Sequence, residues 1–319
     1  MTKPLNYREL PPHLLEVSTL RGVFNVLRCW VPVVILGAIA GTWPAQWWSW
    51  CVALLGIGIL QYHMNILAHS GQHAQLARSR RLNDFLANWF LQAPLGLPFR
   101  RMQRVHFKHH ADLGGAEDED RWYFDLLAVG RDTPARLDRW LLGMFCGATM
   151  VKHALGAGRF LVRRMSGAAR TRPRSASPAR AVFRGEELVA VVVTQILLVT
   201  FFTLVTGAWW AYALLWLVPR FTIMTGLNGV RACIEHADLG EPPGRMKTYV
   251  STRFERLLLS PFNMNYHGEH HVYMQVPYEK LPEIRRMLAA DDSPAAYRVM
   301  SSYFADYRRV RQQLAQANA

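Results

Sequence analysis

Eight histidines lie in three short groups whose spacing is typical of a metal site. The groups read HSGQH, HFKHH and HGEHH. Residues three and four apart share a face of a helix, so each group presents its imidazoles in one direction. Imidazole is a common ligand of iron, zinc and copper, and this many rings can hold two ions and leave coordination positions for oxygen. The histidines are His69, His73, His106, His109, His110, His267, His270 and His271.

The remaining four histidines stand outside these groups. His236 follows Glu235 in the segment RACIEH, and His63 lies a little ahead of the first group. A lone histidine is most often an interfacial or hydrogen-bonded core residue. We therefore expect structural or pore-lining roles for His63, and no metal for His13 and His153.

The segments that must position these histidines are strongly apolar. No Lys, Arg, Asp or Glu occurs at residues 29–77 or at residues 188–219. A soluble domain needs charged surface on nearly every amphipathic element, so these blocks exclude a soluble globule and indicate a bilayer. A crossing helix needs about 20 apolar residues, and each block therefore holds two. The expected spans are about 23–42, 46–65, 187–207 and 209–228.

The turn inside each block carries tryptophans and no basic residue. Trp43 and Trp47 mark the first turn, and Trp209 and Trp210 mark the second. Tryptophan favours the membrane interface, whereas basic loops favour the cytoplasm. Since all 37 Lys and Arg residues lie outside the turns, we expect both termini and the metal site on the cytoplasmic side.

The other segments are expected to lie on that same side. Residues 140–158 predict an interfacial helix rather than a fifth span, because Lys152 interrupts the apolar run. Residues 163–180 predict a basic linker resting on anionic lipid, and residues 279–319 predict cytoplasmic helices. The sequence thus predicts one domain over residues 1–319. Its expected fold class is an all-α integral membrane protein, with four transmembrane helices in two hairpins and a cytoplasmic helical cap that carries a histidine-rich di-metal site.

The net charge limits the classes of binding partner, and the cysteine spacing limits the kinds of cross-link and metal site. The formal net charge is +14, from 37 basic and 23 acidic residues. With the basic residues on one face, we expect membrane lipid and acidic proteins as partners, and no nucleic acid. The four cysteines are far apart in the sequence and form no CxxC pair, which argues against disulfides and a zinc ribbon. They are Cys29, Cys51, Cys146 and Cys233.

The sequence around the histidines resembles the membrane fatty acid desaturase superfamily, which has three histidine boxes and two transmembrane hairpins. The resemblance is carried by HSGQHAQLARSRRLND, PLGLPFRRMQRVHFKHHADLGGAEDED and NMNYHGEHHVYMQVPYEKLPEI. It implies that the eight grouped histidines and His236 hold two non-haem iron ions. It also implies O2 as cosubstrate and the introduction of a double bond into a fatty acyl chain, whose carrier is open.

Two positions depart from the family pattern. Ser70 stands where relatives usually carry an acid directly after the first histidine, so another acid or backbone carbonyls must orient the first pair. Ala232 stands where some relatives carry a water-holding Asn. Glu235 and Glu269 are candidates for hydrogen bonding to the ligating imidazoles. For residues Glu117 to Asp120, a solvated acidic loop is as good an interpretation as a role at the metal site.

Several alternatives remain open at the level of sequence. A hydroxylase, ketolase or oxidative decarboxylase would use the same ligands. Less favoured alternatives, from other functional classes, are a metal transporter and a zinc membrane hydrolase. These 319 residues contain no cytochrome b5-like segment and no CxxC cluster, so we expect a separate electron donor such as ferredoxin or rubredoxin. Candidates for lining an acyl channel are Trp89, Phe90, Leu91, Leu95 and Phe99, although lipid-facing or core packing explains these residues equally well.

Overall fold

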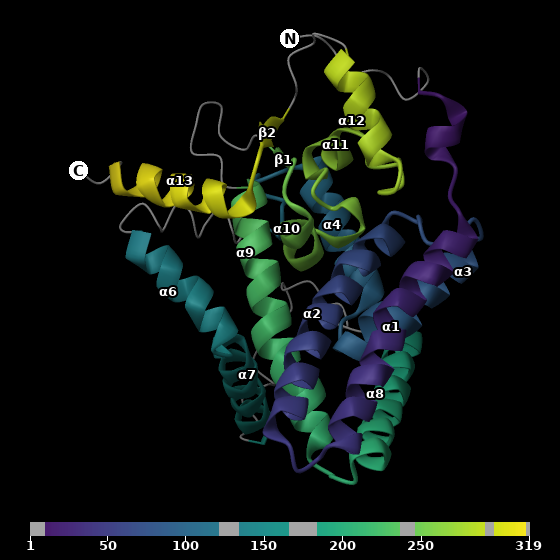
Figure 1. Ribbon diagram of the computed structural model, residues 1–319, viewed down its shortest axis with the longest axis vertical. Helices are drawn as coiled ribbons and strands as arrows, with labels where there is room; N and C mark the ends of the chain where they lie inside the picture. The colour runs from purple at the N-terminus through teal and green to yellow at the C-terminus, as the bar shows by residue number, and fades with distance from the viewer. Residues whose placement is uncertain (1–9, 121–133, 166–183, 237–245, 291–296, 317–319) are drawn as a thin grey trace.

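The computed structural model describes residues 10–120, 134–165, 184–236, 246–290 and 297–316 (Figure 1). Four helices in these ranges are long and apolar enough to cross a membrane. They form two hairpins, and both hairpin turns lie at the same end of the molecule, at the bottom of Figure 1. The helices are α1 (Thr19–Thr42), α2 (Trp47–Gln72), α8 (Gly185–Thr206) and a fourth helix, Ala213–His236.

The fourth helix is irregular and extends further than the sequence indicated. It consists of two π-helical segments, η7 (Ala213–Leu217) and η8 (Arg220–Met224), followed by α9 (Thr225–His236). Pro219 lies between the π segments, where it removes a backbone donor. The expected span ended near residue 228, but the helix continues to His236. Its 24 residues correspond to about 36 Å, which is longer than the hydrocarbon core of about 30 Å.

Packing among the four helices is centred on α2, which contacts α1 and both π segments. By contrast, α8 exposes large apolar side chains such as Ile196, Leu197 and Leu204, as expected of a surface in contact with lipid. The rings of Trp50 and Trp210 contact each other at a tilt of 31°, with centroids 4.8 Å apart, and join the two hairpins near their turns.

The cap at the other end is built from short elements (Figure 1). The chain leaves α2, forms a short helix that passes through π and 3-10 turns, and then enters α4. A three-residue parallel strand pair adds a small sheet to the otherwise helical fold. The cap elements are η2 (Pro12–Leu15), α3 (Arg80–Phe85), α4 (Phe99–Ala111), β1 (Lys247–Tyr249), α10 (Arg253–Leu259), η9 (Pro261–Asn263), α11 (His267–Val272), α12 (Leu281–Ala290), β2 (Arg298–Met300) and α13 (Tyr303–Gln316). The connecting turns η3 (Leu86–Gln92) and η4 (Ala93–Leu95) instead pack against the membrane-length helices, η3 against α1, α2 and α8 and η4 against α8.

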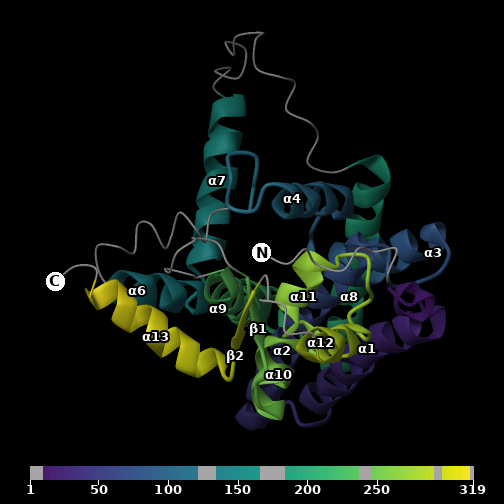
Figure 2. The same cartoon turned by 90° about the horizontal axis from the view of Figure 1, so that it is seen from above.

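The region expected to form one interfacial helix at 140–158 is divided between α6 (Pro134–Phe145) and α7 (Ala148–Met165). The break falls at Gly147, whose φ of 77° is a left-handed conformation that favours glycine. Leu137 and Leu141 of α6 pack with Cys233 and with Val310 of α13. Figure 2 shows α7 projecting away from this packed region. Residues 166–180 of the expected basic linker lie outside the described ranges.

Buried polar contacts hold β1 against α13. The Lys247 ammonium donates to the Asp306 carboxylate at 2.7 Å, and the Tyr249 hydroxyl donates to the same oxygen at 2.7 Å. All three side chains are buried, and removing one partner of such a pair would leave an uncompensated charge. These contacts therefore fix β1, which in turn packs against α11, the helix that carries the third histidine group.

Candidate metal centre

The predicted ligands come from four elements that meet at the cap end of the hairpins. His69 lies in the last turn of α2, and His73 directly follows that helix. The 26 residues of α2 correspond to about 39 Å, so this turn extends beyond a hydrocarbon core of about 30 Å. The second group lies on α4, the third forms most of α11, and His236 ends the fourth helix.

A glycine inside the first group permits close packing at the site. A Cβ added to Gly71 would lie 2.6 Å from the Cβ of Ala87 in η3, closer than side-chain carbons approach. The Gly71 carbonyl also accepts a hydrogen bond from the buried Asn83 amide at 2.9 Å. These contacts fix the end of α2 against the cap and so fix the first histidine pair.

Five imidazoles form one group, which we call the first cluster: His69, His73, His106, His110 and His270. One nitrogen from each lies within 4.8 Å of the others. The Nε2 atom of His106 lies 2.7 Å from Nε2 of His73 and 2.9 Å from Nε2 of His110. The Nε2 atoms of His110 and His270 are 3.1 Å apart. In octahedral or tetrahedral geometry, two nitrogens about 2.0–2.1 Å from one ion lie about 2.9–3.4 Å apart, so this spacing suits a shared cation.

Hydrogen bonding alone does not satisfy this arrangement. The Nε2 atoms of His73, His106, His110 and His270 form a chain with three contacts. Each neutral ring nitrogen is either a donor or an acceptor, so an alternating chain of four supplies two N–H protons for three contacts. A cation to which every nitrogen directs its lone pair removes this conflict.

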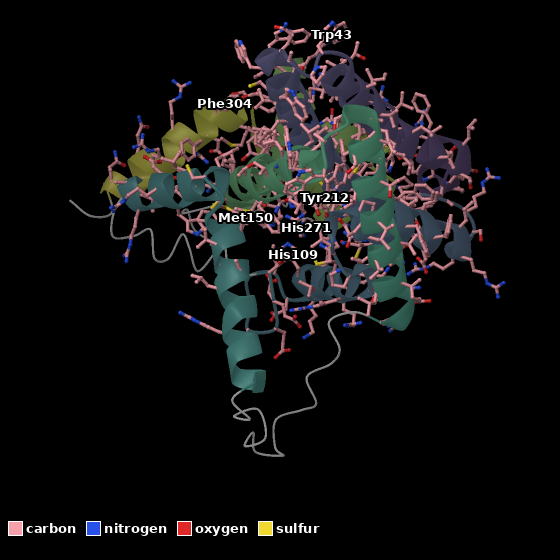
Figure 3. All side chains as sticks on the ribbon, turned by 90° about the horizontal axis from the view of Figure 1, so that it is seen from below. Trp43, His109, Met150, Tyr212, His271 and Phe304 are labelled. Carbon is pink, nitrogen blue, oxygen red and sulfur yellow. The ribbon has the colours of Figure 1, made fainter. Side chains whose placement is uncertain are left out.

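The other predicted ligands form a second cluster beside the first. Nitrogens of His109, His236 and His271 lie within 4.8 Å of one another, and Figure 3 shows His109 next to His271. The Nε2 atoms of His109 and His236 are 3.2 Å apart, and His267 Nε2 lies 3.4 Å from that of His236. The rings of His110 and His271 stack with centroids 4.2 Å apart. The two clusters therefore adjoin, as a two-ion centre requires.

Burial in the cap keeps six of these imidazoles neutral. Burial lowers the pKa of His73 to about 4 and that of His110 to about 2, with His73 and His109 adding to the effect at His110. A neutral ring keeps the nitrogen lone pair that a metal needs. The buried Nε2 atom of His271 has no hydrogen-bond partner among the described residues, which also fits ligation. Burial, with neighbouring imidazoles, holds the pKa well below its ordinary value at His106, His267, His270 and His271.

Three of the rings are oriented by partners on their far side. The buried Asp118 carboxylate lies 2.9 Å from His109 Nδ1, and the Ala232 carbonyl lies 2.8 Å from His236 Nδ1. The Tyr278 hydroxyl contacts His69 Nδ1. Such partners fix the orientation and tautomer of a ligating imidazole. Tyr278 thus supplies a partner that Ser70 cannot, and nothing in the local sequence spacing pointed to it.

The two glutamates predicted beside the ligands behave differently. Glu235 lies 3.7 Å from His267 Nε2, 3.2 Å from the Arg231 guanidinium and 2.8 Å from the Tyr303 hydroxyl. Glu269 instead accepts from the Thr248 hydroxyl and lies 3.7 Å from Arg285. Glu235 therefore borders the second cluster, whereas Glu269 ties α11 to β1 and α12.

The other three histidines lie apart from the clusters where they are described. His13 pairs with the exposed Glu283 at 2.9 Å. His63 is buried with its Nε2 atom 2.8 Å from the Leu257 carbonyl, which is a hydrogen-bonded core position. The side chain of His153 lies outside the described part of the structure.

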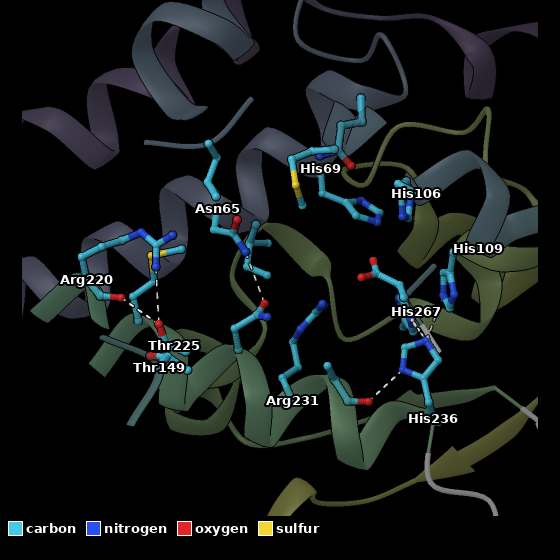
Figure 4. A pocket seen from close by; sticks show the side chains of 18 of the residues that line it. Asn65, His69, His106, His109, Thr149, Arg220, Thr225, Arg231, His236 and His267 are labelled. Carbon is cyan, nitrogen blue, oxygen red and sulfur yellow. Dashed lines mark hydrogen bonds between the residues drawn. The ribbon is translucent and has the colours of Figure 1, made fainter. Parts of the chain in front are cut away.

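A cavity of about 500 Å³ opens from the clusters between α2, α4 and the fourth helix (Figure 4). The histidines at one end of it include His69, His106 and His236. The aromatic and aliphatic residues expected to line an acyl channel do not line this cavity. Trp89 and Phe90 border a separate apolar groove between α1, η3 and α8, while Leu91, Leu95 and Phe99 are buried in the core.

Comparisons with known proteins agree with this geometry. Residues 42–304 match the family model described as "Fatty acid desaturase". No curated protein was found to be similar. The matched region begins at the end of α1, and it contains the other three membrane-length helices in full together with both histidine clusters. With hairpins, clusters and family match in agreement, the chain is a membrane enzyme that belongs to the fatty acid desaturase family.

Proposed function

We propose that this enzyme introduces a double bond into a fatty acyl chain at a histidine-ligated di-iron centre, with O2 as cosubstrate. The observation that supports this best is the convergence of nine imidazoles from four separated elements, five of which line one cavity. An all-nitrogen donor set suits iron. The first cluster would hold one ion. His109, His236, His267 and His271 would hold the other.

The chain's own residues orient the ligating imidazoles, bind the substrate and exclude water from the site. Asp118 and Tyr278 fix the ring orientation of His109 and His69, so that the lone pairs point at the ions. The cavity places a carbon of the substrate beside the clusters and limits access of bulk water. Two reduced iron ions, when bound, supply the oxidising power that removes hydrogen from an unactivated C–H bond with O2.

The balance of the reaction requires an external reductant. Removing two hydrogens from adjacent carbons and reducing O2 to two waters consumes two electrons and two protons beyond those of the substrate. We propose a separate acidic donor such as a ferredoxin or rubredoxin. Exposed basic residues on the cap fit an acidic partner, among them Arg101, Arg104, Arg286, Arg308 and Arg311.

We further propose that the cap, the metal site and both chain ends face the cytoplasm. The support is the distribution of basic residues, which all lie outside the tryptophan-bearing turns. This placement would put the centre where cytoplasmic donors reach it, at the border of the bilayer that supplies apolar substrates.

The competing functions predict other observations. A transporter would place its ligands along the spans at the middle of the bilayer, whereas His69 and His236 lie at helix ends. A zinc hydrolase would contain zinc rather than iron. A hydroxylase would share the site and differ only in the fate of the substrate carbon.

The test is incubation of the purified protein with acyl substrates, a reductant system and labelled O2, followed by mass spectrometry and metal analysis. We expect two irons per chain and a product lighter by two hydrogens without label. Label retained in the product would overturn desaturation in favour of hydroxylation. Zinc in place of iron, with no O2-dependent product, would overturn the oxidoreductase.

A further inference from the structure

The end of the cavity away from the clusters is unusually polar for a wall within membrane-length helices. Arg220, Thr225 and Asn228 of the fourth helix line it, together with Asn65 of α2 and Thr149 of α7 (Figure 4). The Asn65 amide donates to the Asn228 side-chain oxygen at 3.2 Å. A site for an alkyl chain alone needs none of these groups, because apolar side chains would pack against it at least as well.

Arg220 is the residue in this wall whose charge is not neutralised. Its Nε atom donates to the Leu95 carbonyl at 3.0 Å, and its Nη1 atom donates to the Thr225 hydroxyl at 3.4 Å. Within the described ranges, no carboxylate lies at ion-pair distance from this guanidinium, and Nη2 has no hydrogen-bond partner. The Arg220 Cζ atom also lies 5.1 Å from the centroid of the Phe221 ring, so it is the edge carrying Nη2 that is available to a ligand.

The other charged residues of the cavity differ from Arg220. Arg231 lies 3.2 Å from the Glu235 carboxylate, so its charge is compensated within the protein. Asp120 also lines the cavity, and its backbone amide donates to Asp118, the partner of His109. This carboxylate therefore belongs to the cluster end and not to the end that carries Arg220.

The depth of Arg220 argues against a surface role. It lies seven residues, or about 10 Å, from the start of the fourth helix at Ala213, and about 24 Å from His236. It therefore falls within a hydrocarbon core of about 30 Å. A charged side chain at this depth is costly, and such residues usually face an internal cavity and mark a functional site.

We propose that Arg220 binds the carboxylate of the substrate, so that the enzyme oxidises a single-chain fatty acid in its free, unesterified form. The guanidinium donates charge-assisted hydrogen bonds to the carboxylate, and the alkyl portion extends along the cavity toward the clusters. A volume of about 500 Å³ lies in the range of about 300–1,000 Å³ that holds one small ligand. This inference rests on the proposed oxidation of an acyl chain and adds the chemical form of its substrate.

The experiment measures binding without turnover. Tritiated palmitate is bound to the purified protein in a neutral detergent without reductant, and is displaced by palmitate, by methyl palmitate or by a lysophosphatidate of the same chain length. In Arg220→Gln we expect palmitate to bind about ten- to a hundredfold more weakly, the size of one charged hydrogen-bonded contact, and the ester to bind as before. Arg220→Lys keeps the charge and should keep most of the preference for the acid.

Arg253→Gln is the matched control, because Arg253 is exposed on α10, and it should bind all three compounds as the unchanged protein does. Equal affinities of the unchanged protein for acid and ester, or palmitate binding that survives Arg220→Gln, would overturn the proposal. Tighter Arg220-dependent binding of lysophosphatidate than of palmitate would assign the anion to a phosphate headgroup and overturn the carboxylate.

Product analysis separates this inference from the proposed reaction. Arg220-dependent binding of palmitate with no oxidised product under any reducing condition would overturn the reaction and leave the anion site standing. Oxidation of palmitate and methyl palmitate at equal rates, unchanged by Arg220→Gln, would support the reaction and overturn the anion site.

Discussion

Tyr278 orients His69 with a phenol where relatives of this family usually use an acid next to the first histidine. The contact joins α2 to the loop after α11, and the Tyr278 ring also stacks on His270 with centroids 4.8 Å apart. Burial raises the pKa of the phenol well above its ordinary value, so the group stays neutral. A neutral partner makes the imidazole less basic than a carboxylate would.

Replacing Tyr278 by Phe tests this role at a single atom. The change keeps the stack on His270 and removes the hydroxyl, so we expect a loss of about ten- to a hundredfold in iron affinity or activity. Iron titration of the metal-free protein measures the effect. Tyr212→Phe removes a hydroxyl bonded to Gln195 between α8 and the fourth helix, and it should leave iron affinity unchanged. Equal iron affinities in the Tyr278 variant and the unchanged protein would remove Tyr278 from this role.

His236 is the ligand that the local sequence indicates least, because it belongs to no histidine group. Its Nε2 atom lies 3.2 Å from that of His109 and 3.4 Å from that of His267. We expect His236→Ala to lower bound iron and to reduce activity by more than about a hundredfold, which exceeds the usual effect of losing an outer partner. His13→Ala, at an exposed ion pair, should do neither. Full iron content and activity in His236→Ala would exclude this histidine from the site.

At the scale of elements, the ligand-bearing helices follow from the sequence because their signals are local. The charge-free blocks predict the hairpins, and the spacing within HSGQH, HFKHH and HGEHH predicts helical faces. The positions of these elements in the structure agree with that pattern. His69 and His236 lie beyond the expected spans 46–65 and 209–228, because α2 and the fourth helix are both longer than the bilayer core is thick.

The features that escaped prediction depend on contacts between distant segments. The fourth span was expected to end near residue 228, but the helix continues to His236, where Glu235 compensates Arg231, and Arg220 lines a cavity. Asp118 is buried against His109 although its neighbours are acidic and exposed. A sequence records residue types along one chain, whereas these roles depend on which residue lies opposite.

The packing of α2 against η3 gives a prediction at this scale. Gly71→Ala would place a methyl group 2.6 Å from the Cβ of Ala87, and overpacking of this kind costs about 1–3 kcal/mol. We expect a lower unfolding temperature and weaker iron binding. Gly158→Ala on α7 meets no atom within 4 Å and should be neutral or slightly stabilising, since alanine favours helix. Thermal unfolding of both variants measures the difference, and equal temperatures would contradict the close approach.

For the whole molecule, the hairpins and the charge distribution together predict orientation. A reporter fused after Ala319 should report a cytoplasmic location, and reporters inserted near Thr42 or Gly207 should report export, because basic segments remain inside. Activity of paired phosphatase and fluorescent-protein fusions measures this. An exported C-terminus would contradict the proposed placement of the cap.

The basic cap predicts salt-dependent association with an electron donor. Since the net charge is +14, an acidic ferredoxin or rubredoxin should associate at a rate that falls between low and physiological ionic strength, as salt screens the field over about 10 Å. Stopped-flow reduction of the iron centre at several salt concentrations measures the rate. A rate independent of salt would indicate that the basic residues serve only topology and lipid contact.

Arg220 and His236 lie on one continuous helix, and that helix fixes the separation between the anchor and the oxidising end of the cavity. With the carboxylate bound at Arg220, this separation would determine which carbon lies beside the metal clusters. Fatty acids of different lengths would then all react at the same position, numbered from the carboxyl end. The stretch between these residues begins with one π segment, η8 (Arg220–Met224). Inserting or deleting one residue there would change this separation and so move the double bond along the acyl chain without altering a histidine.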